Sequence, residues 1–283
     1  MVRWLVAGSN GMLGQDMVAR LREAGHEVTA ADRSELDITS AQQALDRTAG
    51  HDVVVNCAAW TAVDDAEERE GDAFTVNAVG PQMLARAAAA HGARLVQVST
   101  DYVFDGAAQE PYAEDGAMGP RSAYGRTKAA GEWAVRAYAP DHVVVRTAWL
   151  YGQHGPCFPR TIARAAAQRG SLDVVADQVG QPTWTADLAD LVVRLVEAGV
   201  PSGTYHGTSS GSASWHAFAQ AVVASAGMDP EIVRPTTSEA FVRPAPRPAF
   251  SVLGHDALRA AGVDPIGDWA ARWELAAPHV LGS

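Results

Sequence analysis

Two side chains with complementary acid–base chemistry, Tyr124 and Lys128, stand four residues apart in this 283-residue chain. The surrounding segment, Ser122 to Ala130, has a composition typical of a helix, and residues four apart on a helix share one face. A phenol with a reference pKa of ~10 is a poor acid at neutral pH, but a neighbouring ammonium stabilises the phenolate and lowers that pKa. The pair therefore predicts a proton donor for a carbonyl oxygen that gains negative charge during a reaction.

A Tyr-Lys pair at this spacing also arises by accident on helix surfaces. The composition argues for a specific role, because Lys128 is the only lysine among the 22 Lys and Arg residues. An ammonium is compact and has three donors, so it can reach ribose hydroxyls and a phenol together, whereas the arginine fork has another shape. We interpret Tyr124 and Lys128 as catalytic and keep a surface pair as the alternative.

A glycine-rich loop near the N-terminus indicates what the pair works with. Gly8, Gly11 and Gly14 follow a predicted strand and open a predicted helix, which is the context of a dinucleotide-binding loop. The free N–H groups of a helix N-terminus bind the negative charge of a pyrophosphate. The sequence thus predicts bound NADPH or NADH, whose positive oxidised ring would further lower the Tyr124 pKa; a glycine turn without a ligand is the alternative. The loop residues assigned to the cofactor are Gly8, Asn10, Gly11, Met12, Leu13 and Gly14.

The end of the second predicted strand bears on the choice of cofactor. Asp32 is suited to accept hydrogen bonds from the ribose hydroxyls of NAD, and Arg33 is suited to pair with the extra phosphate of NADP, so both cofactors stay open. Asp37 and Ile38 follow at a position suited to the adenine ring. Asp37 has an equal alternative as the cap of the next helix.

Short β-rich runs alternate with helical stretches along the first half of the chain. This pattern predicts a parallel sheet covered by helices on both faces. The predicted strands are Val2 to Ala7, Glu27 to Ala31, Asp52 to Asn56, Arg94 to Ser99 and His142 to Thr147. The predicted helices between them are Met12 to Ala24, Ser40 to Arg47, Asp72 to His91 and Ser122 to Tyr138.

The alternation loosens beyond about Leu150. Helical stretches at Phe158 to Gln168, Thr185 to Ala198 and Ser214 to Ala226 alternate there with short strands and a Pro-rich segment. We expect a Rossmann-type, doubly wound parallel sheet in residues 1–150, which would bind the cofactor, and a smaller C-terminal α/β substrate lobe in residues 151–283. No clean linker separates the two, so the boundary is soft and their segments are expected to interleave.

Composition excludes several classes of protein. The formal net charge of -11 argues against non-specific nucleic-acid binding, which depends on cationic neutralisation of phosphates. No apolar run approaches the ~20 residues of a membrane span, and the N-terminus passes directly into a strand pattern without a signal peptide. A cytoplasmic, soluble protein is therefore expected. Cys57 and Cys157 are too few for a disulfide framework or a zinc site and are predicted to be free thiols.

Five further motifs, in order along essentially the whole chain, are similar to those of one enzyme family. They are Val55 to Asp64, Ser99 to Gly106, Arg146 to Gly152, Asp177 to Thr183 and Arg247 to Leu253. With the glycine loop, Tyr124 and Lys128, the chain resembles the extended short-chain dehydrogenase/reductases, and within them the dTDP-4-dehydrorhamnose reductases. Each motif alone is weak, but their order makes the resemblance specific.

The resemblance implies roles for residues outside the Tyr-Lys pair. It implies that Thr100 bonds the substrate carbonyl oxygen and assists Tyr124, and that Asp101 and Trp149 contact the sugar. The alternatives are a strand-end cap for Thr100 and an ordinary core aromatic for Trp149. It further implies that three residues lie along the cofactor, namely Ala58, Ala59 and Trp60.

One asparagine, two cysteines and one glutamine qualify the resemblance. Asn77 matches an asparagine that the wider superfamily uses to hold a water, with a polar contact inside the helix as the alternative. Cys57 and Cys157 stand where alanine and asparagine are frequent in the family, and we have no mechanism for either. Gln15 replaces an acidic residue that helps bind magnesium in some relatives, so no metal is expected.

Three functions follow as hypotheses. The first is NADPH- or NADH-dependent reduction of the C4 ketone of dTDP-4-dehydro-L-rhamnose to dTDP-L-rhamnose. The second is the same reaction on another dTDP-4-keto-6-deoxysugar in natural-product biosynthesis. The third, from another class, is a dinucleotide-binding regulatory subunit without catalysis. A homodimer and diphosphate binding by Arg234, Arg243 and Arg247, or their role as solvated loop arginines, stay open.

Overall fold

The computed structural model describes residues 1–282 and is organised around a six-stranded parallel sheet. The strands lie in the spatial order β10-β5-β4-β3-β1-β2, and every neighbouring pair is parallel. Their bounds are β1 (Arg3–Ala7), β2 (Glu27–Ala31), β3 (Val53–Asn56), β4 (Arg94–Thr100), β5 (His142–Thr147) and β10 (Gly203–His206). This confirms the predicted Rossmann-type parallel sheet and all five strands predicted in the first half of the chain.

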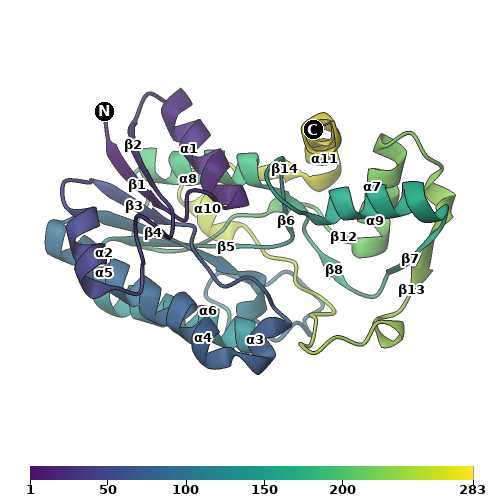
Figure 1. Ribbon diagram of the computed structural model, residues 1–283, viewed down its shortest axis with the longest axis horizontal. Coiled ribbons are helices and arrows are strands. Elements are labelled where there is room, and N and C mark those ends of the chain that lie inside the picture. The colour runs from purple at the N-terminus through teal and green to yellow at the C-terminus, as the bar shows by residue number, and fades with distance from the viewer. Residues whose placement is uncertain (283) are drawn as a thin grey trace.

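Helices cover both faces of this sheet (Figure 1). One face carries α1 (Met12–Glu23), α8 (Thr185–Glu197) and the short α10 (Asp256–Ala260), and the other carries α2 (Ala41–Thr48), α5 (Gly80–His91) and α6 (Ala123–Tyr138). Alternate side chains of a strand point to opposite faces. Trp4 and Val6 of β1 accordingly pack in the α1–α8 core, and Leu5 and Ala7 pack in the other core.

The sheet winds in two directions from β1. The chain passes from β1 to β2 on one side, and β3 then pairs with β1 on its other side. At such a switch point the connections diverge and leave a crevice at the carboxyl ends of the strands. The glycine loop follows β1, the segment beginning with Cys57 follows β3, and Thr100 ends β4. The topology therefore brings these three segments to one edge of the sheet.

A smaller lobe stands beside the sheet, on the right in Figure 1. Its helices are α7 (Phe158–Arg169), α9 (Trp215–Ser225) and α11 (Trp269–Leu281), which share a core around Tyr151, Phe218 and Trp273. Its longest strand pair is β7 (Leu172–Val175) with β13 (Val233–Thr236). The shorter pairs are β6 (Leu150–Tyr151) with β9 (Thr183–Trp184), β12 (Ala213–Ser214) with β8 (Val179–Gly180), and β11 (Ser209–Ser210) with β14 (Ile266–Asp268). Two elements from the second half of the chain lie with the large sheet, since β10 is one of its strands and α8 packs on one of its faces. The boundary near residue 150 stays a prediction.

The helix predicted at Asp72 to His91 is divided in the structure. After the short α3 (Asp65–Glu68), the chain forms α4 (Glu70–Phe74), then a π-helical turn (Thr75–Val79), and then α5. Pro81 in the first turn of α5 has no N–H to offer to the Asn77 carbonyl four residues earlier. Gly131 of α6 packs against that same carbonyl so closely that a Cβ would overlap it. The proline and the close contact together explain the interruption.

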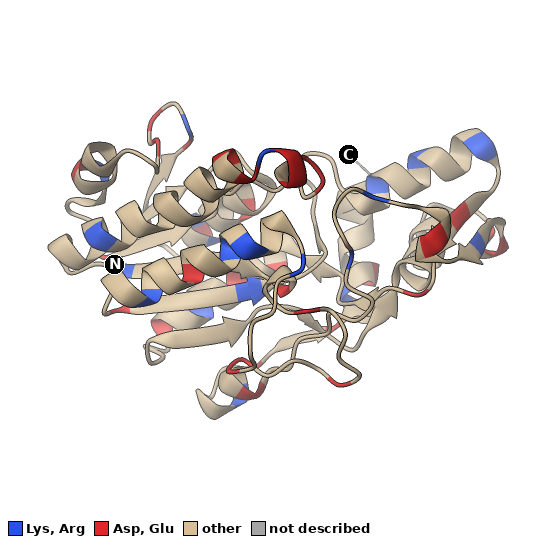
Figure 2. Cartoon of the chain, turned by 90° about the horizontal axis from the view of Figure 1, so that it is seen from below, with Lys and Arg blue, Asp and Glu red and all other residues tan. Residues whose placement is uncertain are grey.

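Charged residues lie mostly on the helices and loops rather than on the central strands (Figure 2). Within residues 1–282, no helix is long and apolar enough to cross a membrane. Cys57 and Cys157 are both free thiols, as predicted.

A buried ion pair holds α6 against β5, an inner strand of the sheet. Glu132 of α6 is fully buried and accepts hydrogen bonds from Arg146 Nε and Nη2 of β5, each at 2.9 Å, and from Ser99 Oγ at 2.6 Å. These donors hold the pKa of the Glu132 carboxyl below its usual value against the opposing effect of burial. Arg136 of α6 bonds Glu132 as well, but its side chain is 33% exposed.

We expect Glu132→Gln to lower the free energy of unfolding by about 3 kcal/mol, because it leaves the Arg146 charge buried without its counter-ion. The matched change Arg136→Gln removes only a partly exposed pair and is expected to cost less than about 1 kcal/mol. Urea unfolding of both variants measures the difference. Equal losses would contradict a dominant role for the buried pair.

Candidate active site

A cleft of about 1240 Å³ opens at the carboxyl ends of the strands, between the sheet and the smaller lobe. Ligand pockets are commonly ~300–1,000 Å³, so this volume suits two ligands side by side. Every residue that the sequence assigned to catalysis, cofactor or substrate lines it. The structure therefore brings together the residues assigned to catalysis, cofactor and sugar.

The glycine loop has the geometry that a dinucleotide requires. Gly8 has a φ of 78°, and a Cβ there would lie 2.6 Å from the Ala58 backbone nitrogen. A Cβ on Gly14 would overlap the Gly8 carbonyl oxygen. Gly11 is the N-cap of α1 and supplies no side-chain cap, so the first N–H groups of the helix, beginning at Met12, lack an intrahelical partner. A pyrophosphate fits this uncapped N-terminus.

Asp32 and Arg33 are differently engaged at the end of β2. The Asp32 carboxylate accepts from Ser34 N at 2.7 Å, Ser34 Oγ at 2.6 Å and Asn10 Nδ2 at 2.6 Å, and the hydrogen bonds led by Ser34 lower its pKa. Three of its roughly four acceptor positions are thus used by the protein. The exposed Arg33 guanidinium makes no hydrogen bond or ion pair within residues 1–282, and its charge contributes to lowering the pKa of Asp37.

Asp37 does not cap α2. The cap is Ser40, whose hydroxyl accepts from Gln43 N, whereas the Asp37 carboxylate accepts from Thr39 N at 3.0 Å and Thr39 Oγ1 at 2.7 Å. The capping alternative is therefore wrong, because the carboxylate closes a turn one residue before the helix begins. Ile38 is buried against Gly80, where a Cβ would lie 2.5 Å from Ile38 Cδ1.

Tyr124 lies in the first turn of α6, which the Ser122 hydroxyl caps by accepting from Gly125 N at 3.1 Å. Gly125 lets this turn approach the end of β4, because a Cβ there would overlap the Tyr102 carbonyl oxygen. The rings of Tyr102 and Tyr124 meet edge to face with centroids 5.5 Å apart. Burial raises the pKa of Tyr124 to about 12, and a hydrogen bond with the Thr100 hydroxyl partly offsets that rise. The chain alone thus shifts this pKa upward, opposite to the lowering expected from a neighbouring ammonium.

Lys128 is 4% exposed, and its Nζ donates to the Val98 carbonyl of β4 at 2.7 Å. Burial lowers its pKa to about 8, and the charges of Glu132 and Cys57 oppose that shift. Cys57 lines the same cleft, and burial raises the pKa of its thiol to about 12. Lys128 is therefore an internal cation with donors left over, and the surface-pair alternative is wrong.

Thr100 and Asp101 are buried where β4 ends. Thr100 Oγ1 donates to Asp101 Oδ1 at 2.9 Å and accepts from Tyr102 N at 3.2 Å, so it does cap the short 3₁₀ turn Asp101–Val103. Asp101 Oδ2 is buried without a hydrogen-bond partner. Burial raises the pKa of Asp101 to about 6, against the effect of the Ser251 and Thr100 hydroxyls.

Trp149 stands at the lobe side of the cleft in a strained conformation. Its φ of 47° is the only positive value for a non-glycine residue in residues 1–282. Its ring stacks on Trp215 at 3.5 Å between centroids, and Gly180 leaves room for it, since a Cβ there would lie 2.5 Å from the indole. Trp149 is partly exposed to the cleft rather than an ordinary core aromatic. Such strain tends to occur at functional sites.

Asn77 makes polar contacts with the protein. Its Oδ1 accepts from Trp60 N at 2.9 Å, and its Nδ2 donates to Trp60 O and Thr127 Oγ1, each at 3.1 Å. Both amide hydrogens are used, so Asn77 holds the loop after β3 against α6. These contacts join Asn77 to another loop and another helix, so they are not the polar contact inside its own helix that was the alternative.

Two of the basic residues considered for diphosphate binding have protein partners. Arg234 pairs with Asp173 at 3.0 Å, and Arg247 pairs with Asp64 at 2.8 Å. Neither they nor Arg243 lines the cleft. Residues that the sequence did not single out do line it, namely Arg69, Tyr102, His154 and Trp215. Arg69 lies over the ring of Trp60 at 4.7 Å, a contact between residues nine apart that spacing alone would not have revealed.

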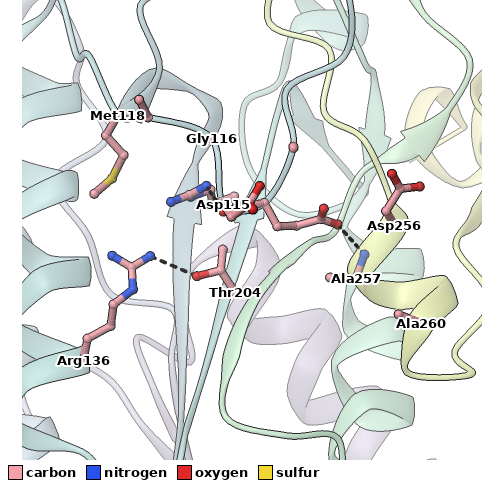
Figure 3. A pocket seen from close by; sticks show the side chains of 12 residues that line it. Asp115, Gly116, Met118, Arg136, Thr204, Asp256, Ala257 and Ala260 are labelled. Atoms are coloured by element: carbon pink, nitrogen blue, oxygen red, sulfur yellow. Dashed lines mark hydrogen bonds between the residues drawn. The ribbon is translucent and has the colours of Figure 1, made fainter.

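A second hollow of about 880 Å³ lies elsewhere on the sheet, beside α6, β10 and α10 (Figure 3). Arg136 there donates to Thr204 at 2.9 Å, and the Glu114 carboxylate accepts from Ala257 N at 3.1 Å. It has no uncapped long helix and none of the candidate residues. The larger cleft is therefore the candidate active site.

Comparison with known proteins gives matches along nearly the whole chain. The family model described as RmlD substrate binding domain matches residues 2–280. The chain is 49% identical over its whole length to a protein of Streptomyces antibioticus named "Probable dTDP-4,6-dihydroxy-2-methyloxan-3-one 4-ketoreductase", of which it covers 97%. It is 48% identical to a dTDP-4-dehydrorhamnose reductase of Streptomyces griseus, with 99% of this chain and 94% of that protein covered.

A solved structure also matches closely. It is the dTDP-4-dehydrorhamnose reductase of Bacillus anthracis in complex with NADP, which superposes with a TM-score of 0.93 at 36% identity and covers 97% of this chain and 98% of that one.

Proposed function

Since this chain belongs to the RmlD substrate binding domain family, we propose that it reduces the C4 ketone of dTDP-4-dehydro-L-rhamnose to dTDP-L-rhamnose with NADPH or NADH. The observation that carries the proposal is the position of the Tyr124 phenol, which shares one cleft with the uncapped glycine loop and the buried Lys128 ammonium. The named relatives support reduction of a dTDP-4-keto-sugar.

The dinucleotide is held by backbone and by few charges. We assign its pyrophosphate to the N-terminus of α1, which is uncapped by any side chain. Lys128 has two donors beyond its bond to Val98, and these suit the ribose hydroxyls. When bound, the reduced nicotinamide supplies a hydride to the carbonyl carbon.

Tyr124 supplies the proton to the carbonyl oxygen. A reductase needs an acid that carries its proton at neutral pH, and a pKa raised to about 12 by burial keeps the phenol protonated. Thr100 assists by hydrogen bonding to the phenol oxygen. Asp101, just after β4, and the stacked Trp149, on the lobe side, line the space left for the sugar.

Arg33 favours NADPH over NADH. Asp32 has three protein donors and so has little capacity left for ribose hydroxyls, whereas the Arg33 guanidinium is free to pair with a phosphate. The anionic Asp32 nearby opposes a phosphate, so both cofactors are expected to work, with NADPH the tighter.

The second candidate is reduction of another dTDP-4-keto-6-deoxysugar. A specific observation favours it, because two of the relatives have names that refer to other sugars, at 49% and 48% identity. Spectrophotometric comparison of NADPH oxidation with several dTDP-keto-sugars separates the two. Efficient turnover of another sugar without turnover of the rhamnose precursor would replace the first assignment.

Other predictions remain open. A regulatory subunit would bind NADPH and never oxidise it while co-purifying with a stoichiometric enzyme partner, and the same assay detects that case. The cytoplasmic location, the homodimer and the lack of a metal stay predictions.

Tyr124→Phe is expected to lower kcat by about 100- to 10,000-fold, because it removes only the proton donor. NADPH affinity, followed by tryptophan fluorescence, is expected to stay within about twofold, since the phenol is one of many contacts along the cofactor. Tyr138→Phe, on the exposed end of the same helix, is the matched control. Wild-type turnover of Tyr124→Phe would exclude this phenol as the acid.

Arg33→Ala is expected to weaken NADPH binding by about tenfold or more, because a charge-assisted bond to phosphate contributes about 1.5–3 kcal/mol. NADH affinity should change little, and the exposed Arg22→Ala serves as the control. Competition with 2′,5′-ADP and 5′-AMP measures the phosphate contribution without turnover. Equal loss for both nucleotides would show that Arg33 does not read the 2′-phosphate.

A further inference from the structure

The Thr100 hydroxyl lies between two acidic groups, the weakly acidic Tyr124 phenol and the more strongly acidic Asp101 carboxyl. On one side is the Tyr124 phenol, to which Thr100 hydrogen bonds, and on the other is the Asp101 carboxyl, 2.9 Å from Thr100 Oγ1. All three groups line the candidate active site, and Thr100 and Asp101 are 6% and 3% exposed. They place three exchangeable protons in a row where the end of β4 meets the first turn of α6.

Building on the proposed reductase, we propose that Thr100 and Asp101 form a proton relay behind Tyr124, so that the Asp101 carboxyl is the net proton donor in the reduction. The phenolic proton goes to the carbonyl oxygen, and the carbonyl carbon receives the hydride of the reduced nicotinamide. The Thr100 hydroxyl proton passes to the Tyr124 oxygen, and the Asp101 carboxyl proton passes to Thr100. The Asp101 carboxylate regains its proton from water after the product leaves.

The hydrogen-bonding capacity of Thr100 fits this relay. A hydroxyl has one proton and accepts two hydrogen bonds. Tyr102 N already fills one acceptor position at 3.2 Å. Thr100 Oγ1 donates its proton to the ionised Asp101 Oδ1 at 2.9 Å. When Asp101 is protonated, the carboxyl donates across that contact instead, which leaves the single Thr100 proton for Tyr124. In the relay, Thr100 therefore donates to the phenol oxygen rather than to the sugar.

The surroundings of Asp101 favour its protonated form. The carboxyl is buried, its Oδ2 has no hydrogen-bond partner, and it forms no ion pair within residues 1–282. A buried carboxyl without a cation is more stable as the neutral acid. The dinucleotide and the dTDP group are both anionic, so their binding disfavours another negative charge in the cleft.

The groups around Asp101 are few. Tyr124 faces it from α6 and Tyr102 from its own turn, while Ser251 reaches it from the segment before α10. The charges of Arg247 and Asp64 shift the pKa of Tyr102 in opposite directions, and these two side chains pair with each other at 2.8 Å.

The other groups beside Tyr124 do not offer an equivalent route. Both amide hydrogens of Asn77 are spent on Trp60 and Thr127. Lys128 donates to Val98 O, and its two remaining donors are assigned to the ribose hydroxyls. Burial makes Tyr124 a weaker acid than a free phenol, so leaving the negative charge on its oxygen is costly. Transferring that charge to a carboxyl whose pKa is about 6 lowers the cost.

Single-turnover oxidation of bound NADPH on a dTDP-keto-sugar tests the relay, with the rate measured against pH and in H₂O–D₂O mixtures. In the wild type the rate should fall as the pH rises above the pKa of Asp101, about 6 in the free protein, because the relay needs the protonated carboxyl. Asp101→Asn should be slower by about tenfold or more and lose this pH dependence. Its proton inventory should indicate fewer moving protons than that of the wild type.

Matched variants separate the relay from a contact to the sugar. Thr100→Ser keeps the hydroxyl and should keep the wild-type pH profile, whereas Thr100→Val should behave as Asp101→Asn. Asp115→Asn, an exposed carboxyl away from the cleft, should change nothing. An unchanged pH profile and proton inventory in Asp101→Asn, with only KM raised, would overturn the relay and leave the reductase standing.

The controls also cover failure at earlier steps. If Asp101→Asn does not fold, by circular dichroism, the contrast between Thr100→Val and Thr100→Ser decides, and equal behaviour of those two overturns the relay. If wild-type protein turns over no dTDP-keto-sugar, the proposed function fails and the relay fails with it.

Discussion

The site depends on the close approach of α6 to the end of β4. Gly125 permits it, since any side chain there would overlap the Tyr102 carbonyl oxygen, and the Ser122 cap fixes where the helix begins. The approach places Tyr124 beside Thr100 and carries Lys128, one turn later, to the Val98 carbonyl of the same strand. The buried Glu132 then secures the helix to β5 through Arg146. A single helix thus positions the proposed acid Tyr124, the cation Lys128 and the ion pair that holds the helix in place.

The cleft has little positive charge of its own, although the proposed ligands are anionic. The pyrophosphate is assigned to the uncapped α1 N-terminus, and among the described residues that line the cleft the buried cation is Lys128, whose pKa burial lowers to about 8. Burial also raises the pKa of both Tyr124 and Asp101. The reduction of a ketone consumes a proton, which a protonated acid must supply. Burial disfavours charged groups, so it makes binding of a charged ligand less favourable but keeps these two acids protonated.

Local patterns predicted the fold well, because buried parallel strands are apolar runs and the glycine loop needs its own residue types. Asp37 shows the limit of local reasoning: Ser40, three residues on, is an equally good cap and is the one used. The split of the Asp72 to His91 helix depends on Gly131, which is distant in sequence, and the Trp149–Trp215 stack joins the two halves of the chain. The upward shift of the Tyr124 pKa follows from burial, which no spacing of residues encodes.

The account rests on Tyr124 lying against the reacting carbonyl beside the cofactor. A crystal structure with NADP and dTDP-L-rhamnose tests this most directly. The account predicts the sugar C4 oxygen within hydrogen-bond distance of the Tyr124 hydroxyl, the nicotinamide ring against C4, and the pyrophosphate at the N-terminus of α1. A sugar bound in the same cleft with C4 turned away from Tyr124 would contradict it.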